Sequence, residues 1–141
     1  MEDYFKYTGK TCVVTGAYSG MGKATAKLLI EMGADVYALD RFQPELDDIK
    51  NWIEIDLADK TSIDHAFAQL PEQMDCFFGI AGVSGVSNTY EETFIIDFVA
   101  NKYITEAYLE SSVTDGGAIA FINSSSGVRW ARPITVEECK A

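Results

Sequence analysis

Three glycines near the N-terminus stand between two different residue patterns. The segment Thr15-Gly16-Ala17-Tyr18-Ser19-Gly20-Met21-Gly22 follows a β-branched run and opens a stretch with helical spacing. Glycines at this spacing let the backbone turn tightly, approach a pyrophosphate and hold the helix close to the strand. The helix that follows presents free N–H groups and its positive dipole end to that phosphate. A plain strand-to-helix turn would explain one glycine but hardly three, so we expect the residues of this turn to bind a dinucleotide: Gly16, Tyr18, Ser19, Gly20, Met21 and Gly22.

A carboxylate follows the second apolar run of the chain. Asp40 ends that run, 18 residues beyond Gly22. Its side chain can accept hydrogen bonds from both hydroxyls of an adenosine ribose, and it would repel the additional phosphate of NADP. Arg41 beside it can instead pair with that phosphate, and an Asp-Arg pair in an ordinary loop is the alternative without a ligand. We favour NAD over NADP as the cofactor.

One amide lies within a long pattern of helical spacing. Asn101 is seven residues from both Phe94 and Tyr108, which predicts that all three lie on one face of the helix. A buried amide without partners costs about 1–3 kcal/mol. Asn101 is therefore either a satisfied polar residue of the core or a functional residue.

The composition excludes several classes of function. The 141 residues are 48% hydrophobic and 23% charged, which is typical of one globular domain. The 22 acidic and 11 basic side chains give a net charge of −11, which argues against binding to nucleic acid or to an anionic membrane. We expect no signal peptide, no membrane-spanning segment and a cytoplasmic location. We also expect no metal site, because the dispersed cysteines and single histidine cannot supply clustered ligands: Cys12, Cys76, Cys139 and His65.

Strands and helices alternate along the chain, and their ends position the residues described above. Apolar runs predict strands over residues 11–15, 36–39, 52–55, 76–81 and 118–122. Helices are predicted over residues 20–32, from a cap at Thr61 or Ser62 to Pro71, and over residues 90–112, and Asp115-Gly116-Gly117 predicts a turn before the last strand. Alternating strands and helices imply parallel strands joined by crossovers, and continuous apolar runs imply helices on both faces of the sheet. We therefore expect one domain over residues 1–141 of the α/β class, with a doubly wound parallel sheet of the Rossmann type.

The spacing of Gly16, Gly20 and Gly22 resembles that of the short-chain dehydrogenase/reductase family. The resemblance to this family extends over about Lys10 to Trp130. In that family an acidic and a hydrophobic residue after the third strand contact adenine, and Asp56 and Leu57 match them. The family's Asn-Ala-Gly after the fourth strand is Ile80-Ala81-Gly82 here. The asparagine is lost, while Ala81 and Gly82 keep the expected close approach to the cofactor. Within the family, the chain is most similar to the 3α-hydroxysteroid dehydrogenase/carbonyl reductase branch.

The resemblance also implies catalytic roles. Asn101 matches the asparagine that holds a water of the family's proton relay. Ser124 matches the serine that hydrogen-bonds the substrate oxygen, with Ser125 and Ser126 less favoured, and a solvated serine turn is the alternative. The family's proton donor is a tyrosine with a lysine four residues on. No tyrosine of this chain has that lysine, and none follows Ser124.

The expected function follows from what is present and what is missing. Thr135 and Glu138 form a Thr-x-x-Glu pattern that opens a helix close to the last residue. We therefore expect the N-terminal portion of a family member, truncated after the fifth strand, that binds cofactor but is inactive alone. The whole protein is expected to transfer hydride between nicotinamide and a small alcohol or carbonyl compound, with hydroxysteroids as one candidate substrate class. A non-catalytic dinucleotide-binding or interaction module is the alternative. Because the helix over residues 90–112 is apolar on several sides, we expect a homodimer or a higher homo-oligomer.

Overall fold

The computed structural model of the chain describes residues 3–125. Their strands form one parallel sheet with the order β3-β2-β1-β4-β5. The strand bounds are β1 Thr11–Thr15, β2 Asp35–Asp40, β3 Asn51–Glu54, β4 Met74–Gly79 and β5 Val113–Phe121. The chain starts in the middle of the sheet, builds outward to β3 and then returns to the other side of β1. This order confirms the doubly wound parallel sheet, and it places the reversal point between β1 and β4.

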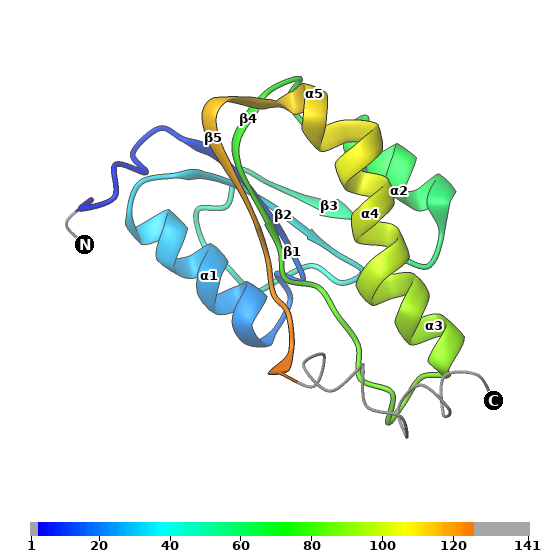
Figure 1. Cartoon of the computed structure of the whole chain (residues 1–141). Coiled ribbons are helices and arrows are strands. Elements are labelled where there is room, and N and C mark those ends of the chain that lie inside the picture. Colours follow the sequence, from blue (N-terminus) through cyan, green and yellow to red (C-terminus); the bar gives the residue numbers. More distant parts are fainter. Residues whose placement is uncertain (1–2, 126–141) are drawn as a thin grey trace.

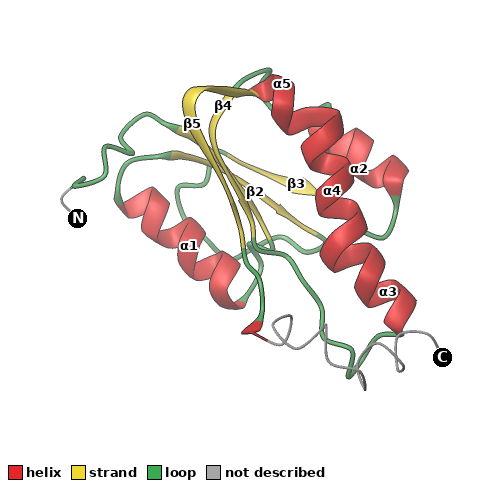
Figure 2. Ribbon diagram, viewed as in Figure 1, coloured by secondary structure: helices red, strands yellow, loops and turns green. Residues whose placement is uncertain are grey.

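Helices cover both faces of the sheet (Figures 1 and 2). One face carries α1 (Gly20–Glu31), and the other carries α2 (Lys60–Phe67) together with one long helix. The long helix consists of α3 (Tyr90–Phe94), η1 (Ile95–Val99), α4 (Ala100–Ile104), η2 (Thr105–Leu109) and α5 (Glu110–Ser112) in unbroken succession. No helix within residues 3–125 is long and apolar enough to cross a membrane.

The two sides of the sheet bury separate apolar clusters. On the α1 side, Val14 and Val36 pack with Ala26 and Leu29 of the helix. On the opposite side, Phe77 of β4 packs with Ile63 of α2 and Ile104 of α4, and all three side chains are at most 2% exposed. Successive strand residues point to opposite faces, so a strand buried on both sides is apolar along its whole length. The continuous apolar runs of the sequence are explained by this arrangement.

The predicted start of α2 is wrong by a few residues. Asp59 is the N-cap residue, and its carboxylate accepts a hydrogen bond of 2.9 Å from the backbone N–H of Thr61. Ser62 has another role, because its Oγ accepts a hydrogen bond of 2.8 Å from the backbone N–H of Asp56. An aspartate accepts such a bond as readily as serine or threonine. The helix therefore begins after Asp59, two residues before Thr61.

Two turns of the long helix are π-helical, η1 and η2. A π turn holds more residues than an α turn, so side chains seven positions apart no longer share a face. Phe94 is 48% exposed, whereas Tyr108 packs against the buried cluster beside α2. The prediction that Phe94, Asn101 and Tyr108 lie on one face is therefore wrong.

The segment expected to turn before the last strand belongs to that strand. Asp115, Gly116 and Gly117 lie within β5, where the register with β4 shifts between Met74 and Cys76. Gly116 has a φ of +79°, which a glycine adopts without strain. The two glycines therefore form an irregularity in the strand instead of a turn. The predictions that concern Ser126, the opening helix at Thr135 and Cys139 lie outside the described residues.

Candidate functional site

A cleft of about 390 Å³ lies at the carboxyl ends of β1 to β4. This is where parallel α/β sheets bind ligands. Every residue expected from the sequence to contact a cofactor lines this cleft: Gly16, Tyr18, Ser19, Gly20, Met21, Gly22, Asp40, Arg41, Asp56, Leu57, Ala81 and Gly82. Six further residues line it that were not expected: Leu39, Phe42, Ile55, Ile80, Val83 and Ile96.

The glycine turn has no room for side chains at two positions. Gly16 has a φ of +74°, and a Cβ built on it would lie 2.8 Å from the Cα of Ala81. A Cβ on Gly22 would collide with the carbonyl of Gly16. The turn thus brings bare backbone to the start of α1, a helix of 12 residues whose N-cap Ser19 makes no side-chain cap hydrogen bond. Such a helix start can receive an anion.

Thr15 ties the end of β1 to the segment that follows β4. Its side chain is fully buried, and its Oγ1 accepts hydrogen bonds of 3.1 Å from the backbone N–H groups of Ile80 and Ala81. The sequence motif that predicts the glycine turn gave no role to this hydroxyl. The bonds hold Ala81 against Gly16 and so define the floor of the cleft.

Asp40 stands at the rim of the cleft, at the end of β2. Its Oδ2 accepts a hydrogen bond of 3.0 Å from the backbone N–H of Tyr18, and its Oδ1 lies 3.4 Å from that of Phe42. The carboxylate is thereby fixed beside the glycine turn, with acceptor capacity left for a ligand because each oxygen has more than one lone pair.

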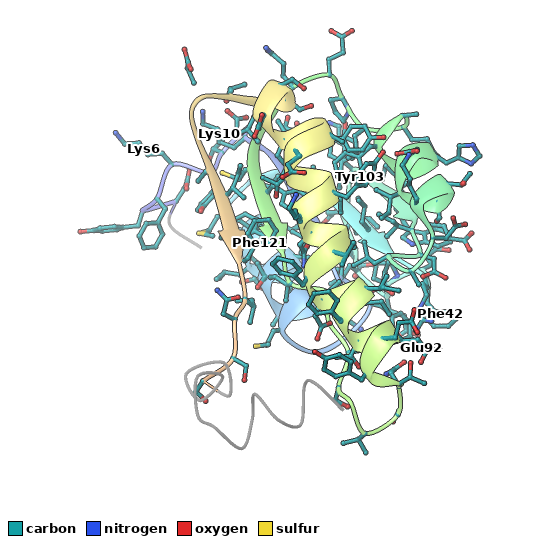
Figure 3. All side chains as sticks on the ribbon, turned by 45° about the vertical axis from the view of Figure 1, so that its right-hand side comes forward. Lys6, Lys10, Phe42, Glu92, Tyr103 and Phe121 are labelled. Atoms are coloured by element: carbon teal, nitrogen blue, oxygen red, sulfur yellow. The ribbon has the colours of Figure 1, made fainter. Side chains whose placement is uncertain are left out.

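Two aromatic rings stand at the same rim. Tyr18 and Phe42 have ring centroids 5.4 Å apart, and their side chains are 45% and 57% exposed. The guanidinium carbon of Arg41 lies 5.7 Å from the centroid of the Phe42 ring. Figure 3 labels Phe42 at the lower right of the molecule, next to Glu92. A planar group bound beside Asp40 would meet these exposed rings, which offer stacking surface.

Asp56 and Leu57 follow β3 at the far side of the cleft from β4. The Asp56 carboxylate accepts a hydrogen bond of 2.9 Å from the backbone N–H of Ala58, which shapes the turn into α2. Leu57 is 6% exposed, so its side chain contributes an apolar wall. A base bound at this end would find one polar and one apolar neighbour.

The two expected catalytic residues do not line the cleft. Asn101 of α4 donates a hydrogen bond of 3.0 Å from Nδ2 to the carbonyl of Asp97, while its Oδ1 is buried without a partner among the described residues. A buried acceptor without a donor is costly, and an ordered water commonly fills this role. Ser124 is exposed just beyond β5. Within residues 3–125 the structure therefore does not bring Asn101 and Ser124 into one site with the cleft.

No group of three or more metal-binding side chains occurs within residues 3–125. Cys12 and Cys76 are free, buried register partners on β1 and β4. Burial first, and the neighbouring Cys76 second, raise the pKa of the Cys12 thiol to about 12. A thiol with this pKa stays protonated near neutral pH and is a poor nucleophile.

The chain is similar in sequence to known proteins. A family model described as short chain dehydrogenase matches residues 10–134. Coniferyl-alcohol dehydrogenase of a Pseudomonas strain is 38% identical over 123 residues, which cover 87% of this chain and 47% of that protein. The 3beta-hydroxysteroid dehydrogenase of Mediterraneibacter gnavus is 27% identical, and the match covers 88% of this chain and 52% of that protein. The chain thus spans about half the length of these relatives.

Solved structures agree on the fold. A short-chain dehydrogenase/reductase of Brucella melitensis superposes with a TM-score of 0.76 at 22% identity, covering 94% of this chain and 62% of that one. A short chain dehydrogenase of Leptospira borgpetersenii, solved with bound NAD+, superposes with a TM-score of 0.70 at 22% identity, covering 91% of this chain and 56% of that one. With the glycine turn, the strand order and the family match in agreement, this chain belongs to the short-chain dehydrogenase/reductase family of oxidoreductases.

Proposed function

We propose that the chain binds NAD in the cleft at the carboxyl ends of β1 to β4 and forms the cofactor-binding part of an NAD-dependent dehydrogenase. The observation that carries this proposal is the glycine turn, where Gly16 and Gly22 have no room for a Cβ and bare backbone faces the start of α1. The cleft volume of about 390 Å³ is within the ordinary range for small-molecule sites. The NAD+ bound in the Leptospira relative supports the same ligand class.

The places of the polar and apolar residues along the cleft suggest how the dinucleotide would lie. Asp40 would accept hydrogen bonds from the ribose hydroxyls, with Asp56 and Leu57 beside the adenine. The pyrophosphate would meet the backbone between Gly16 and Gly22 at the N-terminus of α1. The remaining half would extend toward Ala81 and Gly82 on the β4 side of the cleft. When bound, NAD supplies the hydride acceptor of the reaction.

We propose roles outside the cleft for two residues. Asn101 would hold an ordered water at its buried, unpartnered Oδ1. Ser124, at the end of β5, would hydrogen-bond the substrate oxygen on which charge develops. A dehydrogenase also needs a group that moves a proton to or from that oxygen, a contribution worth about 10²–10⁴-fold in rate. Because no tyrosine of the chain is followed four residues later by lysine, we expect cofactor binding without turnover.

The proposed substrates are small alcohols and the corresponding carbonyl compounds. The similar coniferyl-alcohol dehydrogenase, 3beta-hydroxysteroid dehydrogenase and NAD-dependent glycerol dehydrogenase of Listeria innocua are all named for an alcohol. Hydroxysteroids are one candidate class among these. A reducing cytoplasm remains the proposed location, since Cys12 and Cys76 are buried free thiols.

Calorimetry with NAD tests the binding proposal directly, and it should give a saturable one-site isotherm. NADH oxidation with ketosteroids and small aldehydes should be undetectable for this chain. It should appear when the chain is lengthened past Ala141 by the C-terminal half of the coniferyl-alcohol dehydrogenase relative. Absence of NAD binding contradicts the proposal. Binding without turnover in the lengthened chain favours the non-catalytic module, and turnover by the short chain alone contradicts the inactive fragment.

A further inference from the structure

The wall of the cleft on the β4 side is a loop that needs support. β4 ends at Gly79, and Ile80, Ala81, Gly82 and Val83 then line the cleft. Thr15 Oγ1 accepts hydrogen bonds from the backbone N–H groups of Ile80 and Ala81, so these two residues, the first half of the wall, are fixed to β1. The second half, Gly82 and Val83, lies beyond the reach of these two bonds.

Asp97 of η1 holds the second half of the wall. Its Oδ1 accepts a hydrogen bond of 2.8 Å from the backbone N–H of Val83, 14 residues earlier in the chain. The same oxygen would lie 3.3 Å from a Cβ built on Gly82, so the carboxylate rests against this glycine as well. A charged acceptor makes a stronger hydrogen bond to a backbone N–H than a neutral acceptor does.

Asp97 also makes a contact with Asn101, one turn further along the long helix. Ile96, its neighbour, lines the cleft, and the carbonyl of Asp97 accepts the side-chain amide of Asn101 at 3.0 Å. The wall therefore connects through one residue to the helix that carries Asn101.

We infer that Asp97 is a positioning residue that sets the Gly82 and Val83 wall for the nicotinamide half of the dinucleotide. This inference rests on the proposed function. Asp40 and Asp56 lie at the β2 and β3 side of the cleft, and the glycine turn lies between them and the Val83 wall. A dinucleotide with its adenosine at Asp40 and its pyrophosphate on the turn leaves only its other half for this wall. ADP, which lacks that half, would not reach it.

Calorimetric titration of four proteins with NAD and with ADP tests this inference. The four are the unchanged chain, Asp97→Ala, Asp97→Asn and the control Glu91→Ala, which removes one exposed charge from the first turn of the same helix. Asp97→Ala should weaken NAD binding by about tenfold, a loss that one hydrogen bond to a charged acceptor can support. Its affinity for ADP should stay within about twofold of the unchanged chain, because the Val83 wall does not contact ADP. Asp97→Asn keeps an acceptor oxygen without its charge and should bind NAD with an affinity between those of the unchanged chain and Asp97→Ala. Glu91→Ala should change neither affinity.

Each other outcome overturns a specific part of the argument. NAD bound equally by Asp97→Ala and the unchanged chain overturns the inference alone. Equal losses for NAD and ADP overturn it too, because the residue would then act on the whole fold. Circular dichroism melting of each variant identifies a loss of fold. If the unchanged chain binds ADP but not NAD, or binds neither, the proposed function fails and the inference fails with it.

Discussion

The hydroxyl of Tyr103 on α4 donates a hydrogen bond of 2.6 Å to Asp64 Oδ1 on α2, 39 residues earlier in the chain. Tyr108 donates to the same oxygen, and Lys60 Nζ lies 2.8 Å from Asp64 Oδ2. The Lys60 ammonium also lies 4.7 Å from the centroid of the Tyr103 ring. Figure 3 labels Tyr103 on the long helix, on the side where α2 lies. These four side chains, the Asp64 cluster, connect the two helices on one face of the sheet.

Removing one hydroxyl from the Asp64 cluster should destabilise the protein without changing its core. Tyr108→Phe leaves the ring stacked on Phe67, at 4.4 Å between centroids, but deletes a donor to Asp64. We expect a loss of about 1 kcal/mol in the free energy of unfolding, measured by urea titration. Tyr4→Phe changes a ring that is 84% exposed and should have no effect. Equal stability of Tyr108→Phe and the unchanged chain would contradict a stabilising role for the cluster.

The same cluster predicts a dependence of stability on pH. Hydrogen bonds from Lys60, then Tyr103 and Tyr108, hold the pKa of Asp64 below its ordinary value. Asp64 therefore stabilises the fold above its unfolded pKa of about 3.9, and this contribution is lost as pH falls toward the lower folded value. Between about pH 4 and pH 2 the unchanged chain should lose more stability than Asp64→Asn. Thermal melting across this range measures the difference, and Asp47→Asn, an exposed carboxylate, should instead follow the unchanged chain.

Two glycines of the same turn should respond differently to alanine. Gly22→Ala places a methyl group against the Gly16 carbonyl, so we expect a loss of about 3 kcal/mol or more together with loss of NAD binding. Gly20 has a φ of +56° and open space around it, so Gly20→Ala should cost only the backbone strain of about 1 kcal/mol. Urea titration and calorimetry on both variants measure the contrast. Similar losses for the two would refute the steric reading of Gly22.

Asp40 should decide which dinucleotide is preferred. The unchanged chain should bind NAD more tightly than NADP, because the carboxylate at the rim would face the additional phosphate. Asp40→Asn should reduce this preference by about tenfold, since it removes a charge that repels the phosphate. Asp56→Asn, on the adenine side, should change both affinities alike. Tighter NADP binding by the unchanged chain would instead assign Arg41 as the partner of that phosphate.

The exposed rings of the long helix predict self-association. Phe94 and Phe98 are 48% and 54% exposed, with ring centroids 5.3 Å apart. We expect a homodimer through this face, because a second copy of the chain would remove the exposed apolar rings from water. Phe98→Glu should weaken the dimer by about tenfold or more in light scattering, because a carboxylate would be buried. Val86→Glu, at a loop residue that is 92% exposed, is the matched control. A monomeric unchanged chain at high concentration would disprove the prediction.

Periodicity and turn chemistry were sufficient to predict the sheet and one side of the cleft. The strand β1 was predicted with the bounds that it has, Thr11–Thr15, because β-branched residues stop at a glycine whose conformation few other residues adopt. The place of Asp40 in the cleft was predictable because a polar residue that ends a parallel strand lies at the edge of the sheet where ligands bind. These signals are local in sequence.

The parts that were missed depend on contacts between distant segments. The bond from Val83 to Asp97 and the two bonds to Thr15 cross between elements, so no spacing in the sequence reveals them. Phe42 was not predicted to line the cleft because an aromatic residue in a loop between two elements belongs to no periodic pattern. Its place two residues after Asp40 did indicate that it lies near the end of β2. The π turns were missed since helical spacing assumes a constant number of residues per turn.

The first of these π turns, η1, also shifts the helical phase between the first and the second half of the long helix. The rings of the first half, Phe94 and Phe98, face solvent, whereas Ile104 and Leu109 of the second half are buried against the sheet. An insertion or deletion of one residue within η1 would rotate one half relative to the other while the helix itself continued. The segment Ile95–Val99 therefore sets the rotation of the second half of the helix about its axis relative to the first half. Such an insertion or deletion would turn the exposed rings of Phe94 and Phe98 to a new direction while Ile104 and Leu109 stayed in the core.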